Sequence, residues 1–165
     1  MSMKRALSGL AACVLGLLSL FSFFMMWTGK DLSGRTENIG LFKSTGDGLG
    51  TVMAADIFSL VVFIMACLLA AIFLLNLLGI LKGKNAKPAA LAVSALMVIA
   101  GILTMVFVIM AATDESISKL SVWNAMYNPG FGAWITMIGG TLGGLAGCYY
   151  AMLSSGKKKG GKKKK

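Results

Sequence analysis

The sequence contains no histidine, only two prolines and only six acidic residues in 165 positions. The absence of histidine removes the commonest general base and the commonest metal ligand. The three cysteines, Cys13, Cys67 and Cys148, all lie in hydrophobic stretches, so the sequence indicates no disulfide framework. Paired carboxylates, a phosphate-binding loop and a metal-ligand cluster are also missing at useful spacing. We therefore expect a protein that is not an enzyme and that binds no cofactor or metal.

Apolar sequence dominates instead: 57% of the residues are hydrophobic, and the mean hydropathy is +0.81. Such values are typical of integral membrane proteins. Crossing a hydrocarbon layer of about 30 Å takes about 20 helical residues, and four windows are long enough. These windows span residues 6–27, 52–81, 88–112 and 130–152. The sequence thus predicts an all-α, four-helix transmembrane domain over residues 1–155, followed by a polybasic tail over residues 156–165.

The formal net charge of +10 is distributed unevenly along the chain. Most of the lysines and arginines lie in the N-terminus, in the connection at residues 82–87 and in the tail. All six acidic residues lie in or beside the other two connections. The positive-inside rule therefore predicts that both termini are cytoplasmic, in a multi-pass protein of the cytoplasmic membrane. No Asn-x-Ser/Thr sequence occurs, which slightly favours a bacterial origin.

The tail carries a run of lysines directly after the last predicted helix. These are Lys157, Lys158, Lys159, Lys162, Lys163, Lys164 and Lys165. One interpretation is that they only orient the chain in the membrane; the other is that they bind anionic lipid at the cytoplasmic leaflet or an acidic partner. Nucleic-acid binding is not expected, because no aromatic residues alternate with the lysines.

The last hydrophobic window has a face made of small residues, which we call the small-residue arc. At about 100° per residue its members project within roughly 140° on a helix. They are Gly132, Thr136, Gly139, Gly140, Gly143, Gly144, Gly147 and Ala151. Small residues let membrane helices approach closely, so the arc predicts a packing face. Ser8, Ala12 and Gly16 form a weaker ridge at a matching depth in the first window, and a contact between the first and fourth helices is the preferred use of the arc.

Two polar residues interrupt the second hydrophobic window. Asp56 is expected in the first helical turn, where the helix dipole favours a carboxylate. Asn76 lies deeper, where an amide usually donates a hydrogen bond to another helix. The alternative for both residues is a polar pathway through the membrane.

The two connections with the acidic residues each suggest a short element. Residues 38–43 in the first connection are compatible with a short strand or hairpin arm. In the second connection, hydrophobic residues recur at roughly helical spacing from Ile117 to Tyr127, which predicts a short interfacial helix. Trp27 closes the first window, where an aromatic residue is expected at the membrane interface.

Trp27, together with Gly40-Leu41-Phe42 in the first connection, resembles a motif of the claudin and peripheral-myelin-protein group. In that group a tryptophan is followed by Gly-Leu-Trp and two cysteines in the first external loop. This chain has Phe42 in place of the second tryptophan and no cysteine in the loop. The resemblance implies a four-helix membrane protein without enzymatic activity, with these four residues at its external surface.

Our first functional hypothesis is a membrane protein that acts through protein contacts, as a scaffold, an accessory subunit or a homo-oligomer. The bilayer and a membrane-protein partner or a second copy of the chain are its expected partners. A second hypothesis is an oligomeric channel or transporter in which Asp56 or Asn76 lines a polar route. A third is an immunity-type protein that blocks a membrane toxin.

Overall fold

The computed structural model describes residues 3–30, 35–42, 50–81, 83–113 and 128–153. This part of the chain is mostly helical and contains four segments long and apolar enough to cross a membrane. The first segment combines α1 (Met3–Leu17), a short 3₁₀ turn η1 (Leu18–Phe21) and α2 (Ser22–Met25). The others are α3 (Gly50–Leu77), α4 (Gly83–Thr113) and α6 (Phe131–Leu153). The fold is that of a multi-pass helical membrane protein.

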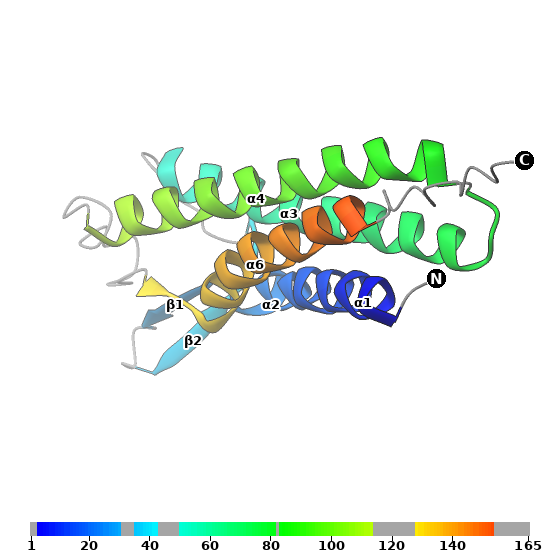
Figure 1. The fold of residues 1–165 in the computed structure, drawn as a ribbon. Coiled ribbons are helices and arrows are strands. Elements are labelled where there is room, and N and C mark those ends of the chain that lie inside the picture. The colour runs from blue at the N-terminus through cyan, green and yellow to red at the C-terminus, as the bar shows by residue number, and fades with distance from the viewer. Residues whose placement is uncertain (1–2, 31–34, 43–49, 82, 114–127, 154–165) are drawn as a thin grey trace, which may run out of the picture.

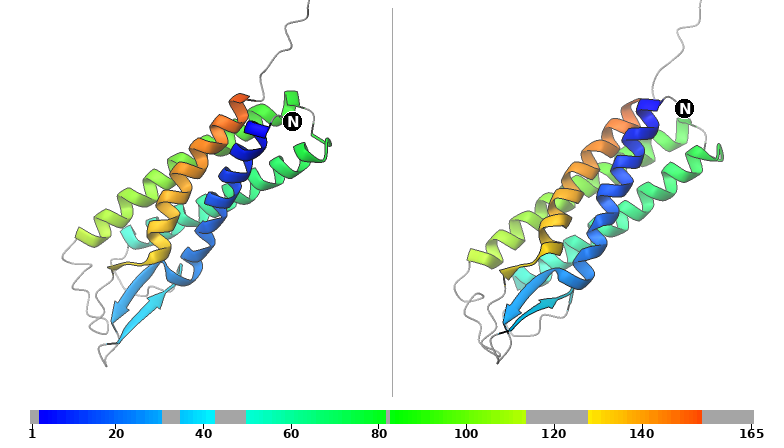
Figure 2. Two further views of the ribbon diagram at one scale, coloured as in Figure 1. Left: turned by 60° about the horizontal axis from the view of Figure 1, so that its bottom comes forward. Right: turned by 90° about the horizontal axis from the view of Figure 1, so that it is seen from below.

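The four segments form a ring in which each packs against two neighbours: α1 contacts α3 and α6, and α4 contacts the same two helices (Figure 1). α1 begins and α6 ends at one end of the bundle, next to the connection from α3 to α4 (Figure 2). We call this the terminal end. The opposite end carries a small β-sheet, and we call it the sheet end.

Helix boundaries differ from the sequence-based windows by a few residues. The first helical segment ends at Met25, so Trp27 starts a strand and does not close a helix. α3 ends at Leu77 because Gly79 adopts a positive φ of 74° and the Ile80 N–H bonds the Leu75 carbonyl. α4 begins at Gly83, five residues before the predicted window 88–112, so Pro88 lies in its second turn and removes one backbone hydrogen bond there.

The sheet has three strands in the order β2-β1-β3. β1 (Trp27–Lys30) pairs antiparallel with β2 (Thr36–Ile39), and its other edge pairs with β3 (Asn128–Pro129), just before α6. The strand expected at residues 38–43 therefore lies a few residues earlier, and β3 was not anticipated. The predicted interfacial helix in the second connection and the lysine tail lie outside the described residues.

Two hydrophobic clusters fill the bundle, one above the other. The cluster at the sheet end surrounds Met26 and Trp27 and includes Val52, Val108 and Met137. The cluster nearer the terminal end includes Val62, Leu69, Met97, Phe73 and Tyr150. Leucine and isoleucine side chains on the outer faces of the helices stay exposed, as expected for surfaces that contact lipid.

Candidate functional site

The side chain of Asp56 joins the sheet to the helix bundle. Its Oδ1 atom accepts a hydrogen bond from the indole Nε1–H of Trp27 at 2.8 Å, and its Oδ2 atom accepts one from the backbone N–H of Phe42 at 2.9 Å. Both Asp56 and Trp27 have an exposed fraction of 0%. Because both carboxylate oxygens have a donor, the burial of Asp56 is compensated. We call Asp56, Trp27 and the Phe42 amide the aspartate clamp.

The backbone around Phe42 is shaped to complete the clamp. Phe42 has a φ of 59°, the left-handed conformation that side chains other than glycine rarely adopt. Gly40 is needed two residues earlier, because a Cβ atom there would overlap the carbonyl oxygen of Phe23. The segment 40–42 thus lies directly on the first helical segment and turns its last amide toward Asp56.

Residues expected at the external surface have a different role in the structure. Trp27, Gly40 and Leu41 are buried, and only Phe42 is exposed, at 49%. Their assignment to the surface was wrong for three of the four residues. The reason is that Asp56, 29 positions after Trp27, supplies a buried acceptor that the local sequence around the tryptophan does not reveal. Asp56 itself lies in the second turn of α3, and its expected place in the first turn was wrong.

The small-residue arc of α6 faces the interior of the bundle, and all eight members are buried. One edge of the arc packs on the first helical segment. A Cβ atom on Gly139 would overlap the Leu15 carbonyl, and one on Gly132 would lie 2.8 Å from the carbonyl oxygens of Phe21 and Met25. The first and fourth helices therefore meet along the arc, with backbone against backbone.

The other edge of the arc packs on α4, which the sequence did not indicate. A Cβ atom on Gly144 would lie 2.9 Å from the Ser94 carbonyl oxygen, and one on Gly140 would lie 3.0 Å from the Cα atom of Gly101. Gly101 thus acts as the counterpart of the arc on α4. The arc serves two neighbours at once, so α6 lies between α1 and α4 at short distance from both.

On α1 the interior ridge differs from the predicted one. The buried residues are Gly9, Ala12, Cys13 and Gly16, whereas Ser8 is only half-buried. Gly9 was missed: a Cβ atom there would collide with the ring of Phe73, because a large aromatic side chain from α3 fills the space beside the glycine. Ser8 instead lines a groove on the outer side of α1.

Asn76 lies near the terminal end and bonds across the bundle. Its Nδ2 atom donates a hydrogen bond to the hydroxyl of Tyr150 on α6 at 2.7 Å. The Tyr150 ring packs edge-on against Phe73, and the Arg5 guanidinium lies 5.1 Å from the ring centroid. This arrangement agrees with the interhelical hydrogen bond that the sequence suggested for Asn76.

Replacement of Tyr150 by phenylalanine is expected to lower the free energy of unfolding by about 0.6 kcal/mol, and at most by about 1.7 kcal/mol, the range of interhelical hydrogen bonds in membranes. The ring stays, so the packing with Phe73 and Arg5 is retained. Unfolding of the purified protein by a denaturing detergent gives the measurement, with the exposed Tyr149→Phe as a control that is expected to change nothing. An equal loss for both variants would contradict the prediction.

Asp56 and Asn76 do not form one site. They lie near opposite ends of α3, and twenty helical residues separate them by about 30 Å. Each forms hydrogen bonds within the protein: Asp56 with Trp27 and Phe42, and Asn76 with Tyr150. In the described part of the chain, no group of three or more Cys, Asp or Glu side chains is placed to hold a metal ion.

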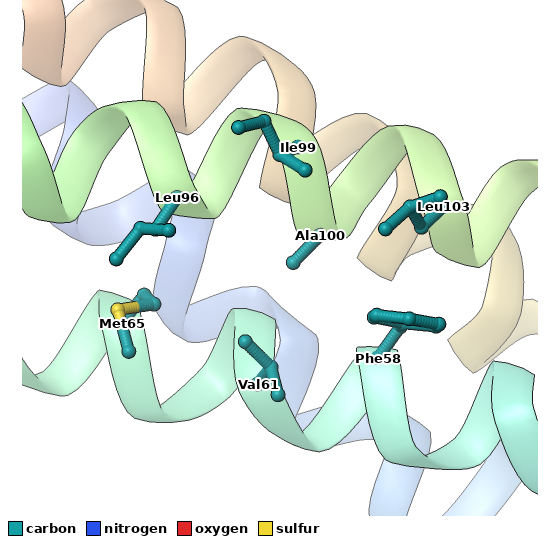
Figure 3. Close-up of a pocket in the computed structure, with 7 residues that line it drawn as sticks. All are labelled: Phe58, Val61, Met65, Leu96, Ile99, Ala100 and Leu103. Atoms are coloured by element: carbon teal, nitrogen blue, oxygen red, sulfur yellow. The ribbon is translucent and has the colours of Figure 1, made fainter.

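A lateral groove of about 300 Å³ opens between α3 and α4 (Figure 3). Phe58, Val61 and Met65 of α3 lie opposite Leu96 and Ala100 of α4, and the lining also includes Ile99 and Leu103 of α4. All lining side chains are apolar, so the groove offers no hydrogen bond to a polar solute. Its chemistry is that of a surface in contact with hydrocarbon.

Four apolar helices with exposed hydrophobic outer faces, joined at one end of the bundle to a small sheet, are the features of a multi-pass membrane protein. Comparisons with protein-family models, with curated proteins and with solved structures found no match for the chain.

Proposed function

We propose that this protein acts through contacts of its sheet end with a partner membrane protein or with a second copy of the chain. The observation that carries the proposal is the aspartate clamp. A fully buried carboxylate with two donors holds the strand pair to the helix bundle, so the sheet moves with the helices as one body. Such rigidity suits a surface that must be presented in one orientation, because less conformational entropy is lost on binding.

The surface offered by the sheet consists of β2 and Phe42. β2 is an edge strand that pairs only with β1 among the described residues, and Thr36, Glu37 and Asn38 are exposed on it. An edge strand presents backbone donors and acceptors that a partner strand can pair with. The exposed Phe42 ring adds an apolar contact beside it.

The orientation in the membrane is part of the proposal. The lysines and arginines of the N-terminus, of the connection at residues 82–87 and of the tail favour a cytoplasmic terminal end. The sheet end then faces outward from the cytoplasmic membrane. The tail lysines attract anionic lipid of the inner leaflet and hold the chain in this orientation.

Photo-crosslinking in intact cells tests the function. A photoreactive amino acid at Glu37 on β2 is expected to give one discrete protein adduct, whose mass distinguishes a partner from a second copy. The same amino acid at Ile109, on the lipid-facing side of α4, is the matched control and is expected to give no protein adduct. Combining the Glu37 probe with Asp56→Ala, which removes the clamp, is expected to abolish the adduct while the protein still inserts.

Equal adducts at both positions, or an adduct that persists without the clamp, would contradict the proposal. Reconstituted liposomes address the alternative of conduction. An ion flux that is present in the parent protein and lost in Asp56→Ala would favour a channel or transporter over a contact function.

A further inference from the structure

A groove on the outer side of α1 combines a positive charge with apolar residues. Lys4, Leu7, Ser8 and Ala11 of α1 and Tyr149 of α6 line it, and its volume is about 330 Å³. The four residues of α1 follow helical spacing and form one stripe, which covers about 10 Å along the helix axis. The charged residue lies at the terminal end of the stripe, and the apolar residues lie further along the helix axis toward its middle.

Among the residues that the structure describes, Lys4 has no acidic partner at this end of the bundle. The acidic residues in the described part of the chain are Glu37 and Asp56, and both lie at the sheet end. The neighbouring Arg5 adds a second positive charge that faces the Tyr150 ring. Both charges lie in the first turn of a membrane-spanning helix, at the depth where lipid phosphates occur. A lipid phosphate is therefore the negative group that we expect to pair with Lys4.

We propose that this groove binds one anionic glycerophospholipid. The phosphate pairs with Lys4, the phenol of Tyr149 and the hydroxyl of Ser8 border the headgroup region, and an acyl chain lies along Leu7 and Ala11. Leu7 and Tyr149 are exposed by 66% and 54% in the protein alone, which leaves apolar area for the lipid to cover. The residues that define the groove belong to the helices α1 and α6.

Native mass spectrometry of the full chain released from nanodiscs tests the site. The discs contain zwitterionic phosphatidylcholine with a minor fraction of anionic phosphatidylglycerol. We expect the parent protein to retain one phosphatidylglycerol molecule in preference to phosphatidylcholine. Lys4→Gln is expected to lower this retention about fivefold, the effect of one lysine near a charged membrane surface.

Two matched controls separate the groove from general attraction by charge. Lys163→Gln removes the same charge from the tail and is expected to leave retention unchanged. Ala11→Phe fills the groove without changing the charge and is expected to abolish retention, whereas Leu10→Phe, on the neighbouring position outside the groove, is expected to have no effect. Thermal unfolding of each variant verifies that it folds. If Ala11→Phe does not fold, Lys4→Gln still tests the site.

Three results would overturn the proposal. An equal loss for Lys163→Gln and Lys4→Gln would indicate general electrostatic attraction. Equal retention of phosphatidylcholine and phosphatidylglycerol would show that the charge does not select the lipid. Displacement of the lipid by millimolar inorganic phosphate would identify a site for free phosphate, in which the acyl chain has no part.

Discussion

Replacement of Asp56 by alanine is expected to lower the free energy of unfolding by about 2–5 kcal/mol. The substitution leaves two donors without an acceptor, the buried Trp27 indole N–H and the partly buried Phe42 amide. Each unpaired buried donor costs about 1–3 kcal/mol. Alanine also removes the cost of burying the carboxylate, which offsets part of these two penalties. The expected decrease in the free energy of unfolding is therefore smaller than the sum of both penalties.

A double-mutant cycle isolates the hydrogen bond to tryptophan. Trp27→Phe removes only one donor and keeps the Phe42 bond, and the two substitutions together are expected to destabilise less than the sum of the single effects. Unfolding in a denaturing detergent, followed by circular dichroism, gives the energies. Hydrogen exchange at residues 36–39 adds a local readout, since loss of the clamp is expected to speed exchange in β2 more than in α4.

Glu37→Gln is the matched control for the clamp, because it removes a carboxylate from an exposed position on β2. We expect it to change stability by less than about 0.5 kcal/mol. If Asp56→Ala is as mild as Glu37→Gln, or if the effects of Asp56→Ala and Trp27→Phe simply add, the clamp does not hold the sheet to the bundle.

Simultaneous replacement of Gly139 and Gly143 by leucine is expected to prevent formation of the folded bundle. A Cβ atom on Gly139 would overlap the Leu15 carbonyl, and one on Gly143 would lie 3.1 Å from the backbone nitrogen of Gly16. Backbone atoms cannot move aside by rotation of a side chain, so the helices must separate. Overpacking at one such site typically costs about 1–3 kcal/mol, and two leucines along one interface add to this.

Two exposed residues at the same depth of α6 provide the control. Ile138→Leu and Leu142→Ile, made together, alter the lipid-facing side and are expected to leave the bundle intact. Detergent-resistant migration and circular dichroism report folding for both double variants. Wild-type behaviour of the glycine double variant would show that the small-residue arc is not a packing face.

Single alanine substitutions divide the arc between its two neighbours. Gly139→Ala is expected to weaken the contact of α6 with α1. Gly144→Ala is expected to weaken the contact of α6 with α4, because the added Cβ atom would approach the Ser94 carbonyl oxygen.

The sequence predicted the packing face of α6 but only the contact with α1. Angular position along a helix follows from residue spacing, whereas the identity of the neighbour depends on how four helices pack, and Gly101 carries no pattern that marks it.

Trp27, at the sheet end, is a second residue whose depth was predicted from the sequence but whose partners were not. Its place at the end of a hydrophobic window indicated an interfacial residue, because tryptophan is common at that depth. The structure buries it, since a carboxylate from α3 accepts the hydrogen bond of its indole and the strand formed by residues 128–129 pairs with β1. Neither partner is near Trp27 in the sequence, so no local pattern could have revealed them.

The class of protein, the number of candidate membrane-spanning helices and the packing face of α6 can be predicted from the sequence. These properties depend on hydrophobic length and on helical periodicity, which are local. The burial of Asp56 in the clamp and the position of α6 between α1 and α4 follow instead from the packing of the whole chain. A buried hydrogen bond and a close backbone contact each need two partners, and here the partners lie far apart along the chain.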